Sequence, residues 1–123
     1  MRIKTGVDIV YIPRIASLID NRQTIERMLH GSELSCLEPQ HIAGIIAAKE
    51  AFFKAFEMRP RWHDIEVRPK PNGKPTLLLS AEFQERVEEL DVSISHDHHY
   101  AIAQVVMKTR ETTGKAATRK RGG

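Results

Sequence analysis

The sequence contains a single cysteine and no long apolar run. One thiol, Cys36, excludes an intramolecular disulfide and any metal site built from several cysteines. Its leucine neighbours predict an ordinary buried or half-buried thiol. No stretch approaches the roughly 20 apolar residues of a membrane-spanning helix, and no charged start leads into an apolar signal segment. We therefore expect a cytoplasmic protein with no membrane partner.

The chain has no excess of positive over negative charge outside its C-terminal end. The 123 residues carry a net charge of +3, but six of the 19 Lys and Arg and one of the 16 Asp and Glu lie in residues 108–123. That segment therefore has a net charge of +5, and residues 1–107 have a net charge of −2. With 41% apolar residues, 1–107 can form one folded domain, whereas 108–123 reads as a basic, disordered tail.

This charge distribution disfavours a nucleic-acid-binding module. The folded part is net negative and does not interleave aromatic with basic residues, as base-stacking surfaces do. Only the tail could contact nucleic acid or an acidic partner, and a solvated extension explains the tail equally well.

The hydrophobic pattern predicts a strand, then helices, a hairpin, a short helix and a second hairpin. The expected strands cover 2–10, 64–68, 74–79, 92–95 and 100–106, and the expected helices cover 12–29, 40–56 and 80–90. A break is expected at Asp20–Asn21 within the first helical region. This order predicts an α+β fold in which a mainly antiparallel sheet packs on the long helix.

Asp8 and Glu50 lie in segments where burying a charge costs free energy. Asp8 interrupts the first apolar strand, and Glu50 lies in the Ala-rich long helix. A shared divalent cation would compensate both carboxylates. The simpler reading of the helix is an intrahelical ion pair between Glu50 and Lys54. Ala43 and Ala47 share this helical stripe and would leave room for a ligand.

Other candidates are individually weak. His96 ends a strand beside a turn, where a histidine can donate to phosphate or transfer a proton, or simply be half-exposed. The run from His96 to His99 lacks the spacing of a zinc site. The Asn72-Gly73-Lys74 turn suits a ligand contact or a plain hairpin. Basic residues of the first helical region either solvate a face or meet an acidic partner or phosphate. These are Arg14, Arg22 and Arg27.

Five short segments follow one another along residues 3–106. They are Gly6–Val10, Ala47–Ala55, Asp64–Val67, Asn72–Pro75 and Val92–Ala103. Taken in this order, they resemble the holo-acyl-carrier-protein synthase group of 4′-phosphopantetheinyl transferases. The resemblance covers everything except the tail, and it assigns 1–107 to the transferase domain.

The resemblance implies an activity in lipid and fatty acid biosynthesis. Members of the group move 4′-phosphopantetheine from coenzyme A to a serine of an apo acyl carrier protein and release adenosine 3′,5′-bisphosphate. By resemblance, Asp8 and Glu50 would hold Mg²⁺ against the pyrophosphate, and Lys54 would add positive charge there. His96 would contact a coenzyme A phosphate or assist proton movement, so Lys54 and His96 are the expected catalytic residues.

The resemblance also implies the binding surfaces and the assembly. The residues expected to bind coenzyme A are Lys54, Gly73, Lys74, Pro75, Ser95 and His96. Arg14, and then Arg22 and Arg27, would dock the acidic carrier protein. Chains of this size in the group form homotrimers with active sites between subunits.

The chain departs from the group at three places. Ile45 stands where the group usually has an arginine, which makes His41 or Lys49 candidates for the missing cation. The segment 56–62 replaces a Gly-rich turn, and Asp97-His98-His99 is an unusual turn composition. These changes keep a second hypothesis open, a weakly catalytic homologue that binds a carrier protein or nucleotide without turnover.

Overall fold

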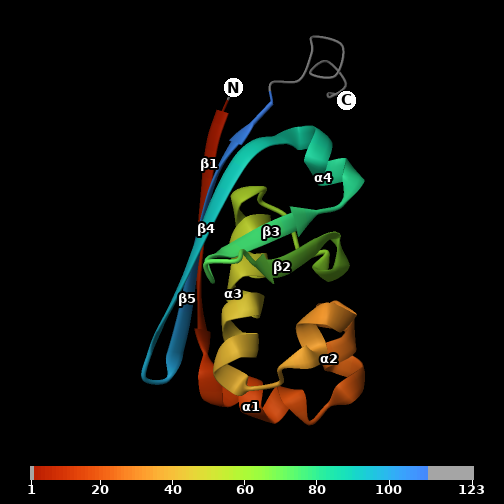
Figure 1. Ribbon diagram of the computed structural model, residues 1–123, viewed down its shortest axis with the longest axis vertical. Helices are drawn as coiled ribbons and strands as arrows, with labels where there is room; N and C mark the ends of the chain where they lie inside the picture. Colours follow the sequence, from red (N-terminus) through yellow and green to blue (C-terminus); the bar gives the residue numbers. More distant parts are fainter. Residues whose placement is uncertain (1, 111–123) are drawn as a thin grey trace.

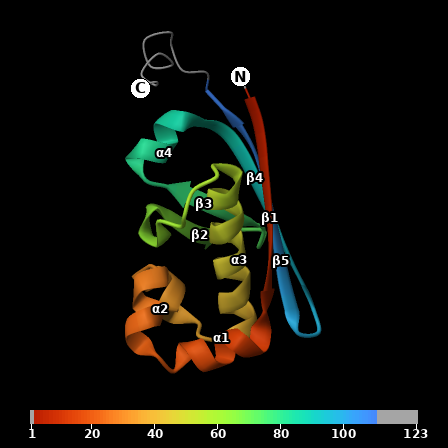
Figure 2. The ribbon, with the colours of Figure 1, turned by 180° about the vertical axis from the view of Figure 1, so that it is seen from behind.

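The computed structural model describes residues 2–110 and shows a three-stranded antiparallel sheet packed on one long helix (Figure 1). The sheet consists of β1 (Arg2–Tyr11), β4 (Val87–Asp97) and β5 (Tyr100–Thr109), in the order β1-β5-β4. Helix α3 (Pro39–Ala55) covers one face of the sheet. No helix or strand of residues 2–110 covers the other face in either view (Figure 2). The expected α+β fold with a mainly antiparallel sheet is confirmed.

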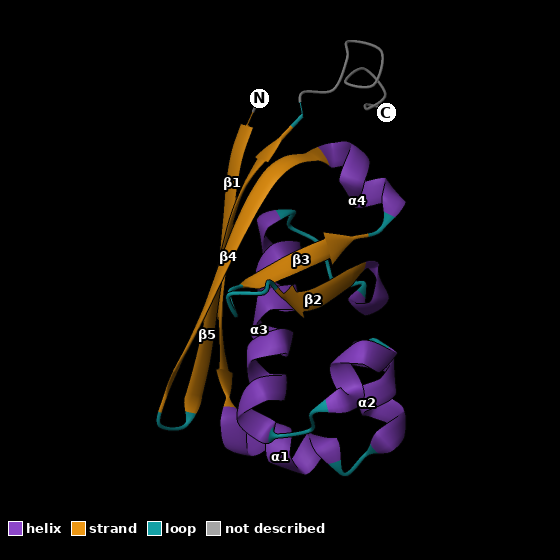
Figure 3. Ribbon diagram, in the orientation of Figure 1, coloured by secondary structure: helices purple, strands orange, loops and turns teal. Residues whose placement is uncertain are grey.

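The remaining elements surround α3 (Figure 3). Helices α1 (Ile12–Ile19) and α2 (Arg22–Met28) lie beside its N-terminal end, and Asp20–Asn21 separates them as expected. The two-stranded hairpin of β2 (Ile65–Pro69) and β3 (Pro75–Leu79) crosses α3, and short α4 (Ala81–Arg86) follows it. Two 3₁₀ turns, η1 (Gly31–Ser35) and η2 (Trp62–Asp64), complete the chain order. No helix in residues 2–110 has the length and hydropathy needed to cross a membrane.

Two predicted boundaries differ from the structure. Helix α4 ends at Arg86, and Val87 and Leu90 belong to β4 rather than to the helical face predicted for them. Val87 takes extended backbone angles and pairs with Thr109, so sheet pairing overrides the helical spacing of these apolar residues.

The last strand continues beyond the domain end expected at residue 107. Strand β5 reaches Thr109, which is buried, and Lys108 forms a 3.1 Å ion pair with Glu89 of β4. The first residues of the expected tail are therefore part of the sheet. Residues 111–123, which make up the rest of that expected tail, lie outside the described residues.

Helix α3 is buried on almost all sides because it lies between the sheet and the β2–β3 hairpin. Ala43 and Ala47 are completely buried, so the expectation that they leave room for a ligand is wrong. They bring the helix backbone close to its neighbours instead. The helix backbone also approaches β1 closely at Gly6, where an added Cβ would overlap the carbonyl oxygen of Ala51.

A buried ion pair holds the opposite side of α3. The Lys49 ammonium is completely buried and lies 2.7 Å from Glu33 Oε1, and it also donates to the carbonyl oxygens of Met28 and Trp62. Burial lowers the pKa of Lys49, and the hydrogen bond and charge of Glu33 oppose that effect. The other Glu33 oxygen accepts from the backbone N–H of Val67 at 2.6 Å. One ion pair thus joins α3 to η1, α2, η2 and β2.

The close approach at Gly6 leads to a stability prediction. In the variant Gly6→Ala, the new methyl group has to displace the backbone of α3, which is more rigid than a side chain. We expect the free energy of unfolding, measured by urea denaturation, to fall by about 3 kcal/mol or more. Gly31→Ala is the matched control, because an added Cβ there meets nothing within 4 Å. Equal losses in the two variants would contradict this explanation.

Candidate active site

The carboxyl groups of Asp8 and Glu50 come together where α3 packs on β1. Asp8 pairs with Ala103 in the sheet, and its side chain is 15% exposed. Glu50 is half-buried and lies within hydrogen-bonding reach of Asp8. Burial, followed by the charge of Asp8, raises the pKa of Glu50. Two carboxyl groups crowded in this way fit a hard divalent cation such as Mg²⁺, which often uses one or two protein carboxylates together with water and substrate phosphates.

Two cations flank this acidic pair. The Lys54 ammonium lies 3.4 Å from Asp8 Oδ1 and 3.1 Å from the carbonyl oxygen of Val7. The Lys54 side chain thus reaches across to β1, and its ion pair is with Asp8 rather than the simple intrahelical pair with Glu50. The charge of Arg14, from α1, also acts on Glu50 and opposes the rise in its pKa. The pair is therefore set in an environment that also attracts anions.

A groove of about 520 Å³ opens beside this acidic pair. Its walls are Glu50, Lys54, Glu57, Met58, Arg59 and Pro60. The segment after α3 forms the rim that was expected to differ from the family, and Glu57 takes a left-handed backbone conformation there, with φ of 57°. The rim therefore presents an arginine next to Lys54, which suits an anionic ligand.

A second cavity, of about 430 Å³, lies on the other side of α3. Its walls include His41, Ile45, Gly73, Pro75, Ile94 and His96. Three of the residues expected to bind coenzyme A therefore face a common space: Gly73, Pro75 and His96.

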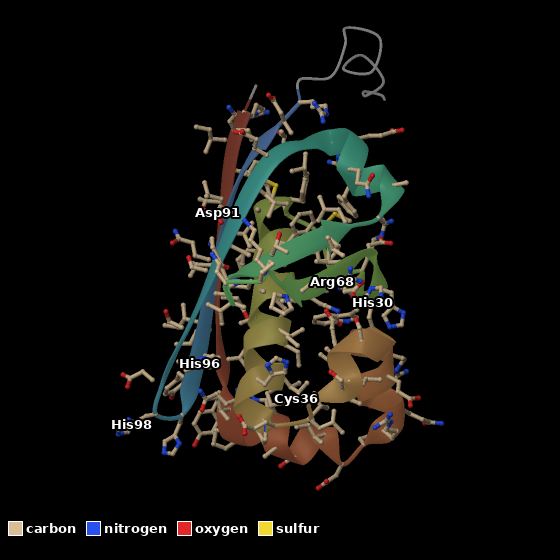
Figure 4. All side chains as sticks on the ribbon, in the orientation of Figure 1. His30, Cys36, Arg68, Asp91, His96 and His98 are labelled. Atoms are coloured by element: carbon tan, nitrogen blue, oxygen red, sulfur yellow. The ribbon has the colours of Figure 1, made fainter. Side chains whose placement is uncertain are left out.

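Cys36 also lines this second cavity. Its side chain is exposed, so the expected buried or half-buried thiol is wrong. Figure 4 shows Cys36 beside the start of α3 and His96 on the neighbouring strand β4. Cys36 follows η1 in an extended conformation, where no element covers it, although Leu34 and Leu37 are partly buried against the core.

The other three residues expected to bind coenzyme A, Lys54, Lys74 and Ser95, do not line the second cavity, and Lys54 lines the groove beside the acidic pair. The Lys74 ammonium lies 2.9 Å from Asp91 Oδ1 and donates to the carbonyl oxygen of Val92, so it ties the hairpin to β4. Ser95 neighbours His96 on β4, and strand alternation puts its exposed side chain on the opposite face of the sheet.

The two candidates for a cation that replaces the family's arginine differ in position. Ile45 is 4% exposed and forms part of the second cavity's wall, and His41 lines the same cavity one helical turn earlier. Lys49 forms an ion pair with Glu33 and is completely buried. Of the two, only His41 can therefore supply a donor to a ligand in this cavity.

The three arginines expected to dock a carrier protein are all exposed on α1 and α2. Of the three, Arg14 is the one whose charge acts on Glu50. Arg22 forms an exposed 2.8 Å ion pair with Glu26 in the next turn of α2. Arg27 contacts only the Thr24 hydroxyl, at 3.5 Å, among the side-chain hydrogen bonds within residues 2–110.

One chain keeps the acidic pair and the second cavity apart. Asp8 lies on β1 and His96 on β4, which are the two edges of the sheet. On α3, Glu50 lies about 180° around the helix from His41 and about 140° from Ile45 at 100° per residue, so they occupy different faces of the helix. Within residues 2–110, no three His, Cys, Asp or Glu side chains gather as a possible metal cluster.

Comparison with known proteins identifies the family. The model of the 4′-phosphopantetheinyl transferase superfamily matches residues 4–105. The chain belongs to this superfamily. The resemblance found in the five sequence segments is therefore confirmed, and so is the expectation that this member of the superfamily is a transferase.

Individual members of the superfamily are similar over most of their length. Holo-[acyl-carrier-protein] synthase of Anoxybacillus flavithermus is 38% identical over 120 residues, which cover 88% of this chain and 97% of that protein. The crystal structure of the Helicobacter pylori synthase in complex with coenzyme A has a TM-score of 0.77 and 34% identity, and covers 85% of this chain and 99% of the other. The Bacillus anthracis synthase, solved with coenzyme A (3′,5′-ADP), has a TM-score of 0.70 and 35% identity, with coverage of 87% and 96%.

Reasoning from the sequence missed two residues that shape the second cavity. Glu33 forms part of its wall and holds Lys49, and Gly44 lies between His41 and Ile45. Gly44 had a detectable signal, because a glycine inside a helix costs about 1 kcal/mol relative to alanine and therefore indicates a packing reason. Glu33 had none, since a polar residue in a short turn is usually solvated.

The crowding of the acidic pair leads to a second prediction. Glu50→Gln removes one negative charge beside Asp8, so the metal-free variant should unfold at the same temperature as the wild type or a few degrees higher. Excess Mg²⁺ should raise the melting temperature of the wild type by mass action and leave that of the variant unchanged. Glu85→Gln, at an exposed position of α4, should respond to Mg²⁺ as the wild type does. An undiminished Mg²⁺ response in Glu50→Gln would exclude Glu50 as a ligand.

Proposed function

We propose that this protein is a holo-acyl-carrier-protein synthase, which transfers 4′-phosphopantetheine from coenzyme A to a serine of an apo acyl carrier protein. The other product is adenosine 3′,5′-bisphosphate, and the pathway context is lipid and fatty acid biosynthesis. The observation that carries the proposal is the Asp8–Glu50 pair flanked by Lys54 and Arg14. The names of the similar synthases support it, as do the coenzyme A complexes of two of them.

Asp8 and Glu50 fit Mg²⁺ because both offer hard oxygen donors in one partly buried place. Bound there, Mg²⁺ would neutralise charge on the pyrophosphate that is attacked. The Lys54 side chain is 60% exposed, so its ammonium can turn from Asp8 toward a phosphate oxygen. Lys54 therefore supplies a mobile positive charge where negative charge develops in the transition state.

The second cavity is our proposed position for the nucleotide half of coenzyme A. Gly73 and Pro75 offer a turn without bulky side chains, and His96 offers a ring that lies against α3. Lys74 contributes indirectly, because its ion pair with Asp91 holds the turn on β4. Ser95 has only its main chain on the cavity side.

We infer a homotrimer with active sites between subunits. An active site needs both the acidic pair and the second cavity, and one chain holds them at opposite edges of its sheet. The uncovered face of the sheet is apolar, with Ile3 70% and Ile9 58% exposed, and monomeric proteins seldom leave such a surface in water. The exposed apolar residues on β1 and β5 are Ile3, Val7, Ile9, Tyr11, Tyr100, Ile102 and Val106. Packing these faces together would bring β1 of one subunit beside β4 of the next.

The carrier protein is proposed to dock on α1 and α2. These helices carry three exposed positive charges, on Arg14, Arg22 and Arg27. The charge of Arg14 also acts on Glu50 of the acidic pair. An acidic carrier protein would be steered to this surface by complementary charge.

The transferase activity can be tested by intact-mass spectrometry. An apo acyl carrier protein incubated with the full chain, coenzyme A and Mg²⁺ should gain the mass of one phosphopantetheine group. Asp8→Ala and Glu50→Ala should each lower the transfer rate by at least about a hundredfold. Each removes a proposed ligand of Mg²⁺, the ion whose charge would stabilise the transition state. Glu85→Ala should retain the wild-type rate, and a chelator should abolish transfer.

A carrier protein that gains no mass would overturn the proposed transferase activity. If several apo carrier proteins gain no mass while the folded protein still binds coenzyme A, the protein is a binding homologue without turnover. Ile45→Arg is then the first reversion to test, because Ile45 is the departure that favours this second function.

Active sites shared between subunits predict complementation between two inactive variants. Asp8→Ala subunits retain the second cavity, and His96→Ala subunits retain the acidic pair. When the two are unfolded together and refolded as mixed oligomers, about a quarter of the sites should be intact, since each of the two contributing subunits is of the required kind half of the time. Transfer rates of the mixture and of each variant alone measure this recovery.

The complementation experiment distinguishes active sites shared between subunits from active sites formed within one subunit. No recovery in mixed oligomers, with each variant folded, would mean that Asp8 and His96 act within the same subunit. The variant Ile9→Glu gives an independent check, because a charge on the uncovered sheet face should shift the oligomer to monomers in light-scattering measurements.

A further inference from the structure

Helix α3 ends in a common kind of turn that contains one unusual residue. The backbone N–H of Met58 donates to the carbonyl oxygen of Phe53 at 3.1 Å, and that of Glu57 donates to the carbonyl oxygen of Lys54 at 3.0 Å. These two bonds form a Schellman motif, in which the residue at the position of Glu57 is left-handed and is usually glycine. Glu57 has this conformation, with φ of 57°. A glutamate therefore occupies a position that glycine would fill with less strain.

The rest of the turn gives no structural reason for a glutamate. Met58 is partly buried against the core, and this supplies the apolar contact that usually accompanies the motif. The Glu57 side chain is exposed, and the ammonium of Lys54 contacts Asp8 and the carbonyl oxygen of Val7 on β1 instead. Residues held in strained backbone conformations cluster at functional sites. The side chain of Glu57 is therefore a candidate for a function that offsets its strain.

Glu57 lies along the space through which a nucleophile would reach the acidic pair. It lines the groove of about 520 Å³ together with Glu50 and Lys54. In the proposed function the pyrophosphate lies at the acidic pair, and the nucleotide half of coenzyme A lies in the second cavity of a neighbouring subunit. The attacking and leaving oxygens stand on opposite sides of the phosphorus in such a displacement. The groove is therefore where we place the attacking serine.

The chemistry of a carboxylate in this groove suits the serine better than the phosphates. An ionised carboxylate only accepts hydrogen bonds, and its charge repels phosphate oxygens. Binding of coenzyme A therefore does not account for Glu57. A serine hydroxyl donates a hydrogen bond, and it has to lose its proton when its oxygen bonds to phosphorus. A carboxylate within reach of the hydroxyl accepts that proton.

We propose that Glu57 is a catalytic residue, the general base that accepts the proton of the carrier-protein serine. The inference rests on the proposed function, because it concerns the same transfer. The serine oxygen forms a bond to the phosphorus of the phosphopantetheine group. The bond from this phosphorus to the leaving adenosine 3′,5′-bisphosphate breaks, and its electron pair departs with the bisphosphate. The hydroxyl proton moves to the Glu57 carboxylate and is then released to water.

This role predicts that stability and activity change in opposite directions in Glu57→Gly. Relief of the left-handed strain should raise the melting temperature of the full chain by about 3 °C. The kcat of transfer to an apo acyl carrier protein should fall by about a hundredfold, which is typical of a lost general base. The KM values for coenzyme A and for the carrier protein should stay within about twofold of the wild type. An unchanged kcat, or a loss confined to KM, would overturn the proposal.

The matched control is His98→Gly. Within residues 2–110, His98 is the other non-glycine residue with a positive φ, at 55°. Figure 4 shows it at the tip of the β4–β5 hairpin, and it does not line the groove. This variant should also gain stability, and it should transfer phosphopantetheine at the wild-type rate. An equal loss of kcat in both variants would overturn the role of the Glu57 carboxylate.

An added carboxylate tests which chemical group is missing. Glu57→Gly leaves space in the groove, so sodium formate should raise its transfer rate in proportion to the formate concentration, with sodium chloride as the control for ionic strength. Glu57→Gln fills the same space with an amide that takes no proton, so it should be as slow as Glu57→Gly and gain nothing from formate. A wild-type rate in Glu57→Gln, or no response to formate in Glu57→Gly, would overturn the general-base role.

Failure of this inference can be told apart from failure of the proposed function. A wild type that transfers phosphopantetheine no faster than Glu57→Gly disproves the inference alone. A wild type that is folded and binds coenzyme A, but transfers nothing to several apo carrier proteins, disproves the function and the base role together.

Discussion

The packing of α3 against β1 is the constraint on which the rest of this structure depends. At Gly6 the strand has no side chain, and the backbone of the helix at Ala51 occupies the space where a Cβ would be. This contact sets how close and in what rotation the helix lies on the sheet. Asp8 and Glu50 meet because they are two residues beyond Gly6 and one residue before Ala51. The acidic pair is therefore a consequence of the helix–sheet contact, and burial there, followed by the charge of Asp8, raises the pKa of Glu50.

The buried pair of Lys49 and Glu33 fixes the opposite face of the same helix. A completely buried ammonium costs free energy, which is offset here by one carboxylate and two backbone carbonyls. Since Glu33 also accepts from the N–H of Val67, the pair determines where β2 and η1 stand relative to α3. Those elements form walls of the second cavity. Neighbouring residues on one helix, Lys49 and Glu50, thus organise two different parts of the proposed active site.

Local pattern predicted most elements but could not assign every side chain. The strand of Asp8, the long helix of Glu50 and the two hairpins follow from apolar periodicity and turn residues. Val87 and Leu90 were misassigned because their spacing of three is typical of a helix, whereas here a β-bulge between Val87 and Glu89 puts both residues on one face of β4, opposite Thr109 and Met107 of β5. Lys74 looked like a phosphate donor, yet its partner is Asp91 on a strand distant in sequence. Cys36, near two leucines, was expected to be buried or half-buried and is exposed.

The fold class, the family and the pairing of two carboxylates that no apolar environment would tolerate alone can all be read from the amino-acid sequence. These depend on local periodicity and on residues whose chemistry is costly wherever they are placed. Only the tertiary structure decided that Lys49 is buried with Glu33, that Gly44 admits His96 to the helix backbone, and that Asp8 and His96 lie at opposite edges of one sheet. Each of these depends on which segments distant in sequence become neighbours, and packing of the whole chain sets that choice rather than any local preference of the residues.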